Sequence, residues 1–555
     1  MTDPKQQVAK QAINEYMSGE LSRRGFMRRL GMVGIGVAAS STLLAACAET
    51  AEKSGPDANK GKPVSGGTLR EGYDRELTAP DTVQNAWADP CFNALFEALV
   101  ARDPEGNIVP MLAESFESSA AGWSFKLRSG LTFHSGAALT GAAVAAYFDL
   151  ARDMKVGANA SFWNPITKVN ATADTVECVT SAPFRAFQET VCTEYSYVIN
   201  TASREKAGKD WGSKTIDGTG PFTLKEFVPS QRMVVERWDD YPGSGLPYSQ
   251  NKGKAYLDAI EWIPITEASQ RAAEIETGNV NALKNPPSQD IDRLKSNPSL
   301  VVQEFQELSN FFLSLNVGEK QLGFDDLRVR QAISHAIDRE AIVESILLGH
   351  GVATHGPIMP GNRWYSDEVA SLNAFDTSES ARLLDEAGWT PGGDGVRTKD
   401  GTRLSFKVMH ITDTVENQVL QAIASMLQEV GVEIELDGRT SATFWAEIGN
   451  TTTAYALKWL WSSPMDVIDY FVTYLQAEGP DSDAYRAAYT AWQTAGTEEE
   501  MQSAAQTMQK LYAERLPLIP VYTPNTVWVN HENVVGWQPN QANLYPWYND
   551  VWLAG

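Results

Sequence analysis

Residues 311–351 read FFLSLNVGEKQLGFDDLRVRQAISHAIDREAIVESILLGHG. The pattern of apolar and polar residues predicts a helix over 326–348. Two charged neighbours within it, Asp338 and Arg339, are expected either to bond the adjacent loop or to lie on the surface as an ordinary polar pair. The strands and helices predicted along the rest of the chain indicate the class of the fold.

Short strand-like runs bounded by turn residues alternate with amphipathic helices along the chain. The predicted strands include 123–133, 233–238, 259–265 and 404–411. The predicted helices include 378–387, 416–430 and 498–515. Such an alternation is typical of a mixed α/β fold.

Capping residues support three of these helices. Gly388 and Gly431 follow two of them, as expected for C-terminal caps. Thr497 with Glu500 three residues later predicts a capping box at the start of the last helix.

The first 46 residues have the organisation of an export signal. A twin-arginine run, SRRGFM at 22–27, precedes an apolar segment at 31–46 that is shorter than the roughly 20 residues of a spanning helix. The box LAAC at 44–47 places a lipid-modified cysteine, Cys47, at the start of the mature chain. An Arg-Arg pair alone also occurs at solvated helix ends, but the order of these features predicts a lipoprotein exported by the twin-arginine route. Residues 47–66 lack periodicity and are expected to form a flexible tether.

The mature chain is strongly acidic. Residues 1–46 hold six basic and three acidic side chains, so the remainder has 40 basic and 67 acidic residues, a net charge of −27. Such a charge disfavours nucleic acid and anionic lipid as partners. The length predicts at least two lobes, because one hydrophobic core seldom serves so long a chain.

Three cysteines remain beside Cys47, namely Cys91, Cys178 and Cys192. At most one disulfide can form among them. Cys178 and Cys192 are close enough in sequence to staple a hairpin, and they are equally compatible with two buried thiols that never meet.

The chain resembles the extracytoplasmic solute-binding proteins of peptide, opine and nickel ABC importers, family 5, the oligopeptide- and dipeptide-binding type. The resemblance rests on segments that occur in the family's order: GGTLREG at 66–72, WSFKLRSGLTFHSG at 123–136, GTGPFTLKEFVPSQRMVVERWDDY at 218–241, the run at 311–351, SARLLDEAGW at 380–389 and LPLIPVY at 516–522. Each segment is weak evidence alone, and their order along the chain is strong evidence.

The resemblance implies an α/β fold of the two-lobed periplasmic-binding-protein kind, type II, large cluster. Lobe I would span 67–310, with an extra subdomain at about 85–210. Lobe II would span 311–515, and 516–555 would return to lobe I. Two crossing strands at the hinge, 311–316 and 519–522, would let the lobes close over a solute.

The resemblance also implies a function without chemistry. The protein would capture a peptide or a peptide-like or opine-like solute outside the cytoplasmic membrane and deliver it to permease subunits of an ABC importer. We expect a lipid-anchored monomer at the periplasmic side or cell surface, with no catalytic residue, no metal and no cofactor.

Candidate ligand contacts follow from the same resemblance. Asn310 and Phe311 lie at the first crossing and are expected to line the cleft or to serve the core. Arg363, Trp364 and Tyr365 follow the turn PIMP at 357–360, and an arginine there would suit a carboxylate through two parallel hydrogen bonds.

Peptide-binding members of the family hold the peptide amine with an Asp in a Trp-rich segment. Here that segment is YALKWLWSSPMDVIDYF at 455–471, which lacks the usual Asp-Pro pair. Asp466 is preferred over Asp469 as the amine partner. Trp459 and Trp461 would form a flat apolar wall, unless they belong to the core.

Two other functions are compatible with parts of the sequence. An exported hydrolase would need a motif such as GxSxG, HExxH or CxxC, and none occurs; the single SxxK, 203–206, is explained by a serine that caps a helix. A binding protein for an oligosaccharide or a nickel chelate would share the fold, although His350 and His355 are poorly spaced as ligands on one helix.

Overall fold

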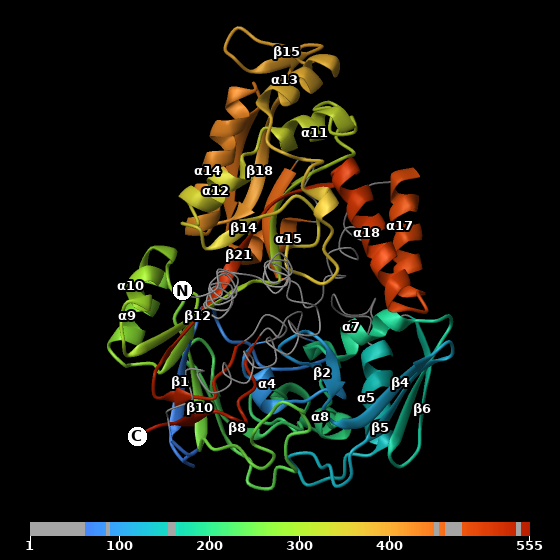
Figure 1. Cartoon of the computed structure of the whole chain (residues 1–555), viewed down its shortest axis with the longest axis vertical. Helices are drawn as coiled ribbons and strands as arrows, with labels where there is room; N and C mark the ends of the chain where they lie inside the picture. Colours follow the sequence, from blue (N-terminus) through green and yellow to red (C-terminus); the bar gives the residue numbers. More distant parts are fainter. Residues whose placement is uncertain are drawn as a thin grey trace, which may run out of the picture.

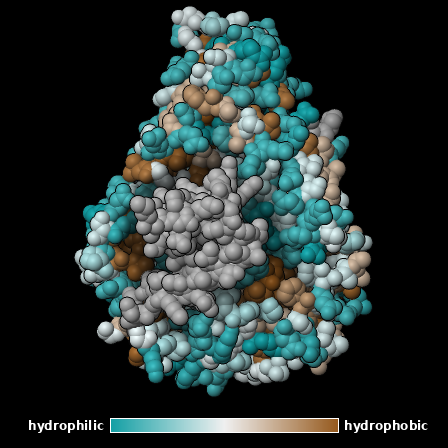
Figure 2. All heavy atoms as spheres, in the orientation of Figure 1, coloured by the Kyte–Doolittle hydropathy of each residue, from teal (hydrophilic) through white to brown (hydrophobic). Residues whose placement is uncertain are grey.

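A computed structural model of the chain describes residues 61–84, 89–153, 163, 165–448, 454–460, 480–539 and 545–555. The chain folds into two α/β lobes that lie one above the other along the long axis (Figure 1). We call the lower one lobe I and the upper one lobe II. In the view of Figure 2 both lobes have a mostly hydrophilic surface, and apolar residues gather near the middle of the molecule.

One twelve-stranded sheet runs through both lobes. Ten strands follow one another in the order β19 (Glu433–Arg439), β18 (Ser405–Ile411), β20 (Ala454–Leu460), β13 (Ser309–Leu315), β21 (Leu518–His531), β11 (Ala282–Lys284), β1 (Thr68–Tyr73), β10 (Ala259–Pro264), β9 (Arg232–Arg237) and β8 (Phe222–Val228). Two more, β12 (Leu300–Gln306) and β14 (Gly351–Ala353), also pair with β21. The predicted mixed α/β fold is confirmed.

The long strand β21 passes from one lobe to the other. Its first half pairs antiparallel with β13, where Leu313 lies opposite Ile519. Its second half pairs with β11 and β12 of lobe I. Ile519 belongs to the core of lobe II, whereas Val527 and Val529 belong to a core of lobe I. β13 and β21 therefore join the lobes at the positions where the sequence predicts the two crossings.

Every residue of β13 is buried, because both faces of this strand are covered. Phe311, Leu313 and Leu315 point into the core of lobe II. Phe312 points to the opposite face and joins the larger core that continues into lobe I.

The single helix predicted over 326–348 is wrong, because the chain forms two helices there, α11 (Leu327–His335) and α12 (Arg339–Ser345). Asp338 has an extended backbone, and its carboxylate accepts a hydrogen bond from the N–H of Ala341 at 3.0 Å. The side chain thus starts a new helix in place of continuing the old one. Arg339 donates to carbonyls of the neighbouring loops, which confirms that this polar pair bonds the adjacent chain.

The other helices of lobe II agree with the predictions to within two residues at each end. They are α13 (Thr377–Glu386), α14 (Thr414–Glu429) and α18 (Glu498–Arg515), to which the structure adds α15 (Ser441–Glu447) and α17 (Pro480–Gln493). Gly388 and Gly431 follow α13 and α14 with φ of +87° and +83°, a conformation that favours glycine. Thr497 and Glu500 form the predicted capping box of α18.

A separate antiparallel sheet of four strands lies at the lower right of lobe I in Figure 1. Its strands are β4 (Ala113–Ser119), β5 (Gly122–Leu127), β7 (Thr175–Thr180) and β6 (Ile166–Ala171). The helices of lobe I are α4 (Phe92–Leu95), α5 (Gly141–Asp153), α7 (Gln188–Val191), α8 (Thr201–Ala207), α9 (Ala268–Glu276) and α10 (Ile291–Lys295). Cys91, Cys178 and Cys192 are all buried free thiols, so the hairpin disulfide is not formed.

Candidate solute-binding site between the lobes

Parallel strands of both lobes end beside the crossing strands. In lobe I, β1 and β11 are parallel neighbours, and Asp74 and Asn285 are the first residues after them. In lobe II, β18 and β20 are parallel neighbours, and Lys458 lies near the end of β20. Ligands of α/β proteins bind beyond the carboxyl ends of such strands. The strand ends therefore locate the candidate site.

Charged groups of the two lobes influence one another across this junction. The charge of Asp74 in lobe I contributes to the raised pKa of Lys458 in lobe II. Burial lowers the pKa of Arg271 in lobe I, and the charge of Asp413 in lobe II opposes that lowering. These charges therefore lie close enough to act on one another across the junction.

Lys284 is the most unusual of the charged groups at the junction of the lobes. Its side chain is only 5% exposed. The ammonium lies over the rings of Trp528 and Tyr545, 5.4 and 5.3 Å from their centroids. No hydrogen bond or ion pair to another described residue reaches it. Burial lowers the pKa of Lys284, and the negative charge of Asp74 opposes that lowering. Lys284 is thus a buried cation without a bonded anion in the part of the chain that the structure describes.

Two arginines of lobe I, Arg271 and Arg75, make hydrogen bonds within the protein. Arg271 donates to the carbonyls of Asn285 and Ile265 at 2.8 and 2.7 Å. Arg75 donates to the hydroxyls of Tyr73 and Tyr545 at 2.5 and 2.7 Å. Of these three cations of lobe I, Lys284 is the one that makes no hydrogen bond to a described residue.

Asp74 is held in place beside Lys284. Its carboxylate accepts a hydrogen bond from the amide of Asn285 at 2.7 Å. Burial would raise the pKa of Asp74, but the positive charges of Lys284 and Arg75 outweigh that effect and keep the pKa below its usual value. Asn285 itself has φ of +54°, a conformation that Asn tolerates better than most residues.

Lobe II contributes both signs of charge. Lys458 lies 3.4 Å from the buried carboxylate of Glu307, and this partner raises the pKa of Lys458. Glu416 is in the first turn of α14, and one of its carboxylate oxygens has no hydrogen-bond partner among the described residues. Burial raises the pKa of Glu416 to about 7, although Lys458 opposes the rise. The junction thus presents groups for both a cationic and an anionic part of a ligand.

Asn310 and Phe311 make their contacts within the protein. The amide of Asn310 donates to the carbonyl of Gly356 at 3.2 Å and accepts from the hydroxyl of Thr354 at 3.0 Å. Phe311 is fully buried and stacks on Tyr522, with 5.0 Å between ring centroids. Both side chains fix the position of β13 relative to its neighbours.

Arg363, Trp364 and Tyr365 lie together on the segment after the PIMP turn. The guanidinium of Arg363 stacks over the ring of Trp364, 4.3 Å from its centroid, and forms ion pairs with Glu189 and Glu498. Trp364 is buried. Tyr365 is partly buried, and burial raises its pKa. The donors expected for a solute carboxylate are thus bonded to protein carboxylates.

The remaining predicted site residues are only partly within the described structure. The backbone of Trp459 pairs with Asn310 in the sheet, so the end of β20 reaches the junction. Trp461, Asp466, its alternative Asp469 and the lipidation residue Cys47 lie outside the described residues.

Sequence reasoning missed Lys284, Lys458 and Asp74. A signal was present for Lys284, because a charged residue directly follows the apolar end of the segment GNVNAL. In a parallel sheet such a residue at a carboxyl end faces the ligand side. The neighbouring aromatic rings, Trp528 and Tyr545, come from residues 244 and 261 positions later, and no local pattern predicts them.

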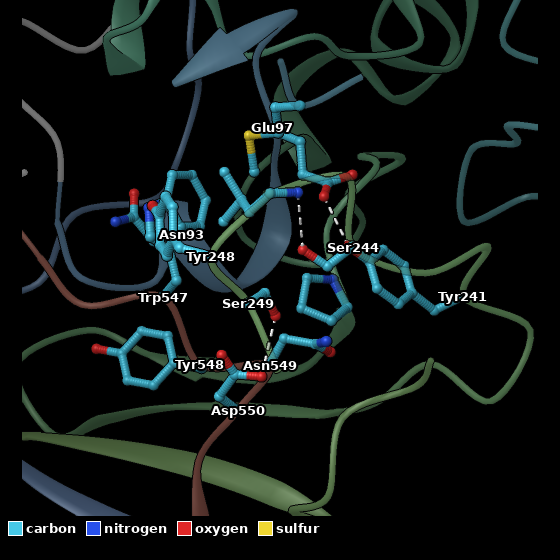
Figure 3. Close-up of a pocket in the computed structure, with 13 residues that line it drawn as sticks. Asn93, Glu97, Tyr241, Ser244, Tyr248, Ser249, Trp547, Tyr548, Asn549 and Asp550 are labelled. Carbon is cyan, nitrogen blue, oxygen red and sulfur yellow. Dashed lines mark hydrogen bonds between the residues drawn. The ribbon is translucent and has the colours of Figure 1, made fainter. Parts of the chain in front are cut away.

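A small pocket lies inside lobe I (Figure 3). Its volume of about 20 Å³ admits a water-sized group, so this pocket is too small for a solute. Glu97 on its wall accepts a hydrogen bond from the hydroxyl of Tyr241 at 2.6 Å, and Ser249 donates to Asp550 at 2.9 Å.

Glu97→Gln is expected to weaken the pH dependence of unfolding. Burial raises the pKa of Glu97 from 4.5 to about 7, against the opposing charge of Arg128, so the folded protein keeps a proton that the unfolded chain releases. The stability from this group is complete below pH 4.5 and is lost as the pH rises through 7. Between pH 4.5 and 8 the free energy of unfolding, measured in urea, should fall by on the order of 3 kcal/mol more for the wild type than for the variant.

The exposed Glu117 serves as control. Glu117→Gln should leave the dependence of the unfolding free energy on pH as it is in the wild type, and the same dependence in all three proteins would contradict the prediction.

Within the described ranges, no helix combines the length and the apolar character needed to cross a membrane. The same ranges contain no group of three or more His, Cys, Asp or Glu side chains placed to hold a metal ion.

Two α/β lobes joined by two crossing strands, with charged side chains at the junction, define a two-lobed binding protein. The model of the family described as bacterial extracellular solute-binding proteins, family 5 Middle, matches residues 107–482. The chain therefore belongs to this family of solute-binding proteins of ABC importers. Members act outside the cytoplasm and are not enzymes, which excludes the exported hydrolase.

Individual relatives cover most of the chain. The oligopeptide-binding protein AppA of Bacillus subtilis (strain 168) is 26% identical over 545 residues, which are 92% of this chain and 96% of AppA. The glutathione-binding protein GsiB of Escherichia coli (strain K12) is 28% identical over 429 residues, 76% of each chain.

Solved structures show the same fold. The structure of AppA in complex with a nonapeptide has a TM-score of 0.74 and 21% identity, and the match covers 89% of this chain and all of that one. NikA from Brucella suis in complex with Fe(III)-EDTA has a TM-score of 0.75 and 20% identity, with 88% of this chain and all of that one covered.

Proposed function

We propose that this protein is a lipid-anchored receptor that captures a peptide or a peptide-like or opine-like solute outside the cytoplasmic membrane and delivers it to the permease of an ABC importer. The observation that carries the proposal is Lys284 at the junction of the lobes, a buried ammonium to which no anion of the described residues is bonded. Burying a charge is costly unless a counter-charge meets it. A carboxylate of the solute would supply that counter-charge.

The relatives support a solute with carboxylate groups. AppA has been solved with a nonapeptide, and GsiB is a glutathione-binding protein. Both ligands carry a carboxylate and an amine. A metal chelate is the second candidate, because NikA has been solved with Fe(III)-EDTA and EDTA is also rich in carboxylates. An oligosaccharide would use Trp459 and Trp461 and would not need Lys284.

Opposite ends of the solute would meet opposite charges. In our proposal Lys284 of lobe I binds the carboxylate, and Asp466, in preference to Asp469, binds the amine. Trp459 and Trp461 provide the apolar wall between these ends. We expect the protein to act as a monomer. Lobe I (67–310, with the return segment 516–555) and lobe II (311–515) would move relative to each other about the crossings, and closure would bury the solute.

The experiment that tests this function begins with the solute that the purified protein retains, identified by mass spectrometry. Peptides and opine-like compounds whose masses match that of the retained solute are then titrated into the protein by calorimetry. Binding should raise the melting temperature, since ligand at a hundred times Kd adds about 2.7 kcal/mol of stability. Retention of a neutral oligosaccharide, with no binding of any carboxylate compound, would overturn the proposal.

The export route has its own test. Arg23→Lys combined with Arg24→Lys should leave the precursor in the cytoplasm, because the paired arginines are the recognised signal. Cys47→Ala should give an exported product without lipid, detected by its loss from the membrane fraction. Normal export of the double-lysine form would rule out the twin-arginine route.

A further inference from the structure

Lobe I and lobe II are joined by an ion-pair network away from the candidate solute site. Glu189 on α7 of lobe I is its centre, and its side chain is only 4% exposed. One carboxylate oxygen pairs with Arg102 of lobe I at 2.8 Å, and the other pairs with Arg363 of lobe II. Glu189 therefore bonds cations from both lobes.

Glu498 of lobe II is the second carboxylate of the network, and it also lies near cations of both lobes. This residue begins α18, and its carboxylate pairs with Arg363 at 3.2 Å. It also lies 3.7 Å from Arg185, which precedes α7 in lobe I. Figure 1 shows α7 directly below the lower ends of α17 and α18. We call Arg102, Arg185, Glu189, Arg363 and Glu498 the interlobe network.

Each half of the interlobe network is firmly attached to its own lobe. Gln509 of α18 donates to the carbonyl of Trp364 at 2.6 Å, so α18 and the segment of Arg363 form one unit. Asn373 of lobe II donates to the carbonyl of Ala513 at the end of α18. In lobe I, Trp123 of β5 donates to the carbonyl of Phe184, just before Arg185. The two halves can therefore separate only when the lobes separate.

We propose that the interlobe network is a latch that sets the fraction of closed molecules, and thereby the affinity for the solute, without touching the solute. Opening would leave Glu189 with Arg102 alone and would break both ion pairs of Arg363. Closing recovers these ion pairs whether or not a solute is present. Because the apparent Kd equals the intrinsic Kd divided by the closed fraction, a weaker latch raises the apparent Kd. The affinity part of this inference rests on the proposed solute-dependent closure.

The test measures closure directly and without solute. Gln188 in lobe I and Met501 in lobe II touch across the interface, with 3.9 Å between the amide nitrogen and the sulfur. Gln188→Cys combined with Met501→Cys, treated with a short bismaleimide, should crosslink at a rate that reports how often the lobes meet. Cys192→Ala is included in every background, since this thiol follows α7.

Arg363→Gln in this background should lower the crosslinking rate about ten-fold, which corresponds to about 1.4 kcal/mol of closure free energy. Arg363 is 39% exposed, so its loss should not prevent folding. Glu189→Gln should act in the same direction, with folding checked by circular dichroism. The matched control is Arg382→Gln. Among the described residues Arg382 forms its ion pairs with Glu379 and Glu386 of lobe II, so its loss should leave the rate unchanged.

An unchanged crosslinking rate in Arg363→Gln and Glu189→Gln would overturn the latch. That outcome would leave solute binding by the wild type intact. Conversely, a wild type that binds no carboxylate solute would refute the proposed function, while the rates without solute would still test the latch.

Discussion

Lys284→Met is expected to weaken the binding of a carboxylate solute by roughly thirty-fold to several thousand-fold, equal to about 2 to 5 kcal/mol. Methionine keeps the length and the contact with Trp528 and Tyr545 but removes the charge. The solute carboxylate would then be buried without its counter-charge. Isothermal titration with the retained solute measures the effect.

The same substitution should change the stability of the empty protein little, because two effects oppose each other. Burial lowers the pKa of Lys284, so methionine removes a charge that is costly to bury. Methionine also removes the positive charge that helps to keep the pKa of Asp74 low. A much lower affinity with a melting temperature close to that of the wild type separates a binding role from a structural one.

The matched control for this experiment is Lys407→Met. Lys407 is an exposed lysine of β18 that pairs with Glu435 at 3.0 Å. Its loss should change neither affinity nor stability. Equal affinities of Lys284→Met and wild type would show that the solute carboxylate binds elsewhere or is absent.

Arg339→Met is expected to lower the stability of the protein by on the order of 5 kcal/mol. The side chain is 1% exposed and donates to six acceptors in the protein. They are the carbonyls of Ser334, Ile337, Thr354, Asn373 and Pro520 and the hydroxyl of Ser334. Methionine fills the space but leaves buried carbonyls without donors, and an unsatisfied buried polar group costs about 1 to 3 kcal/mol.

Urea unfolding measures this loss as a shift of the midpoint. Arg328→Met is the control, because Arg328 lies in the preceding helix α11 but is exposed and pairs with Asp326 at the helix start. We expect little change for the control. A midpoint for Arg339→Met equal to that of the control would mean that water replaces the lost donors.

The helices and strands of the fold were largely predictable because they follow from local patterns. The apolar spacing of α14 and the capping box of α18 involve residues a few positions apart. The break between α11 and α12 was not predicted. Asp338 caps α12 locally, but Arg339 is turned inward by carbonyls of segments as distant as Pro520. Those acceptors become visible only when β21 is packed against lobe II.

The candidate site was predicted less well, for the same reason. The resemblance placed Arg363 among solute contacts, whereas its ion pairs are with Glu189 and Glu498. Glu189 is 174 residues away in sequence. Charge pairs of this kind depend on how the lobes approach one another, which no short motif encodes.

By itself the sequence determined the family, the α/β class and the two crossings, because each depends on residue types repeated in a fixed order along the chain. Only the tertiary structure decided which charges are free and which are paired. Lys284 meets Trp528 and Tyr545, and Arg363 meets Glu189, because β21 and α7 bring together segments that are remote in sequence. Whether a charged side chain binds a solute or another residue depends on its burial and on its neighbours in space, and these exist only in the folded chain.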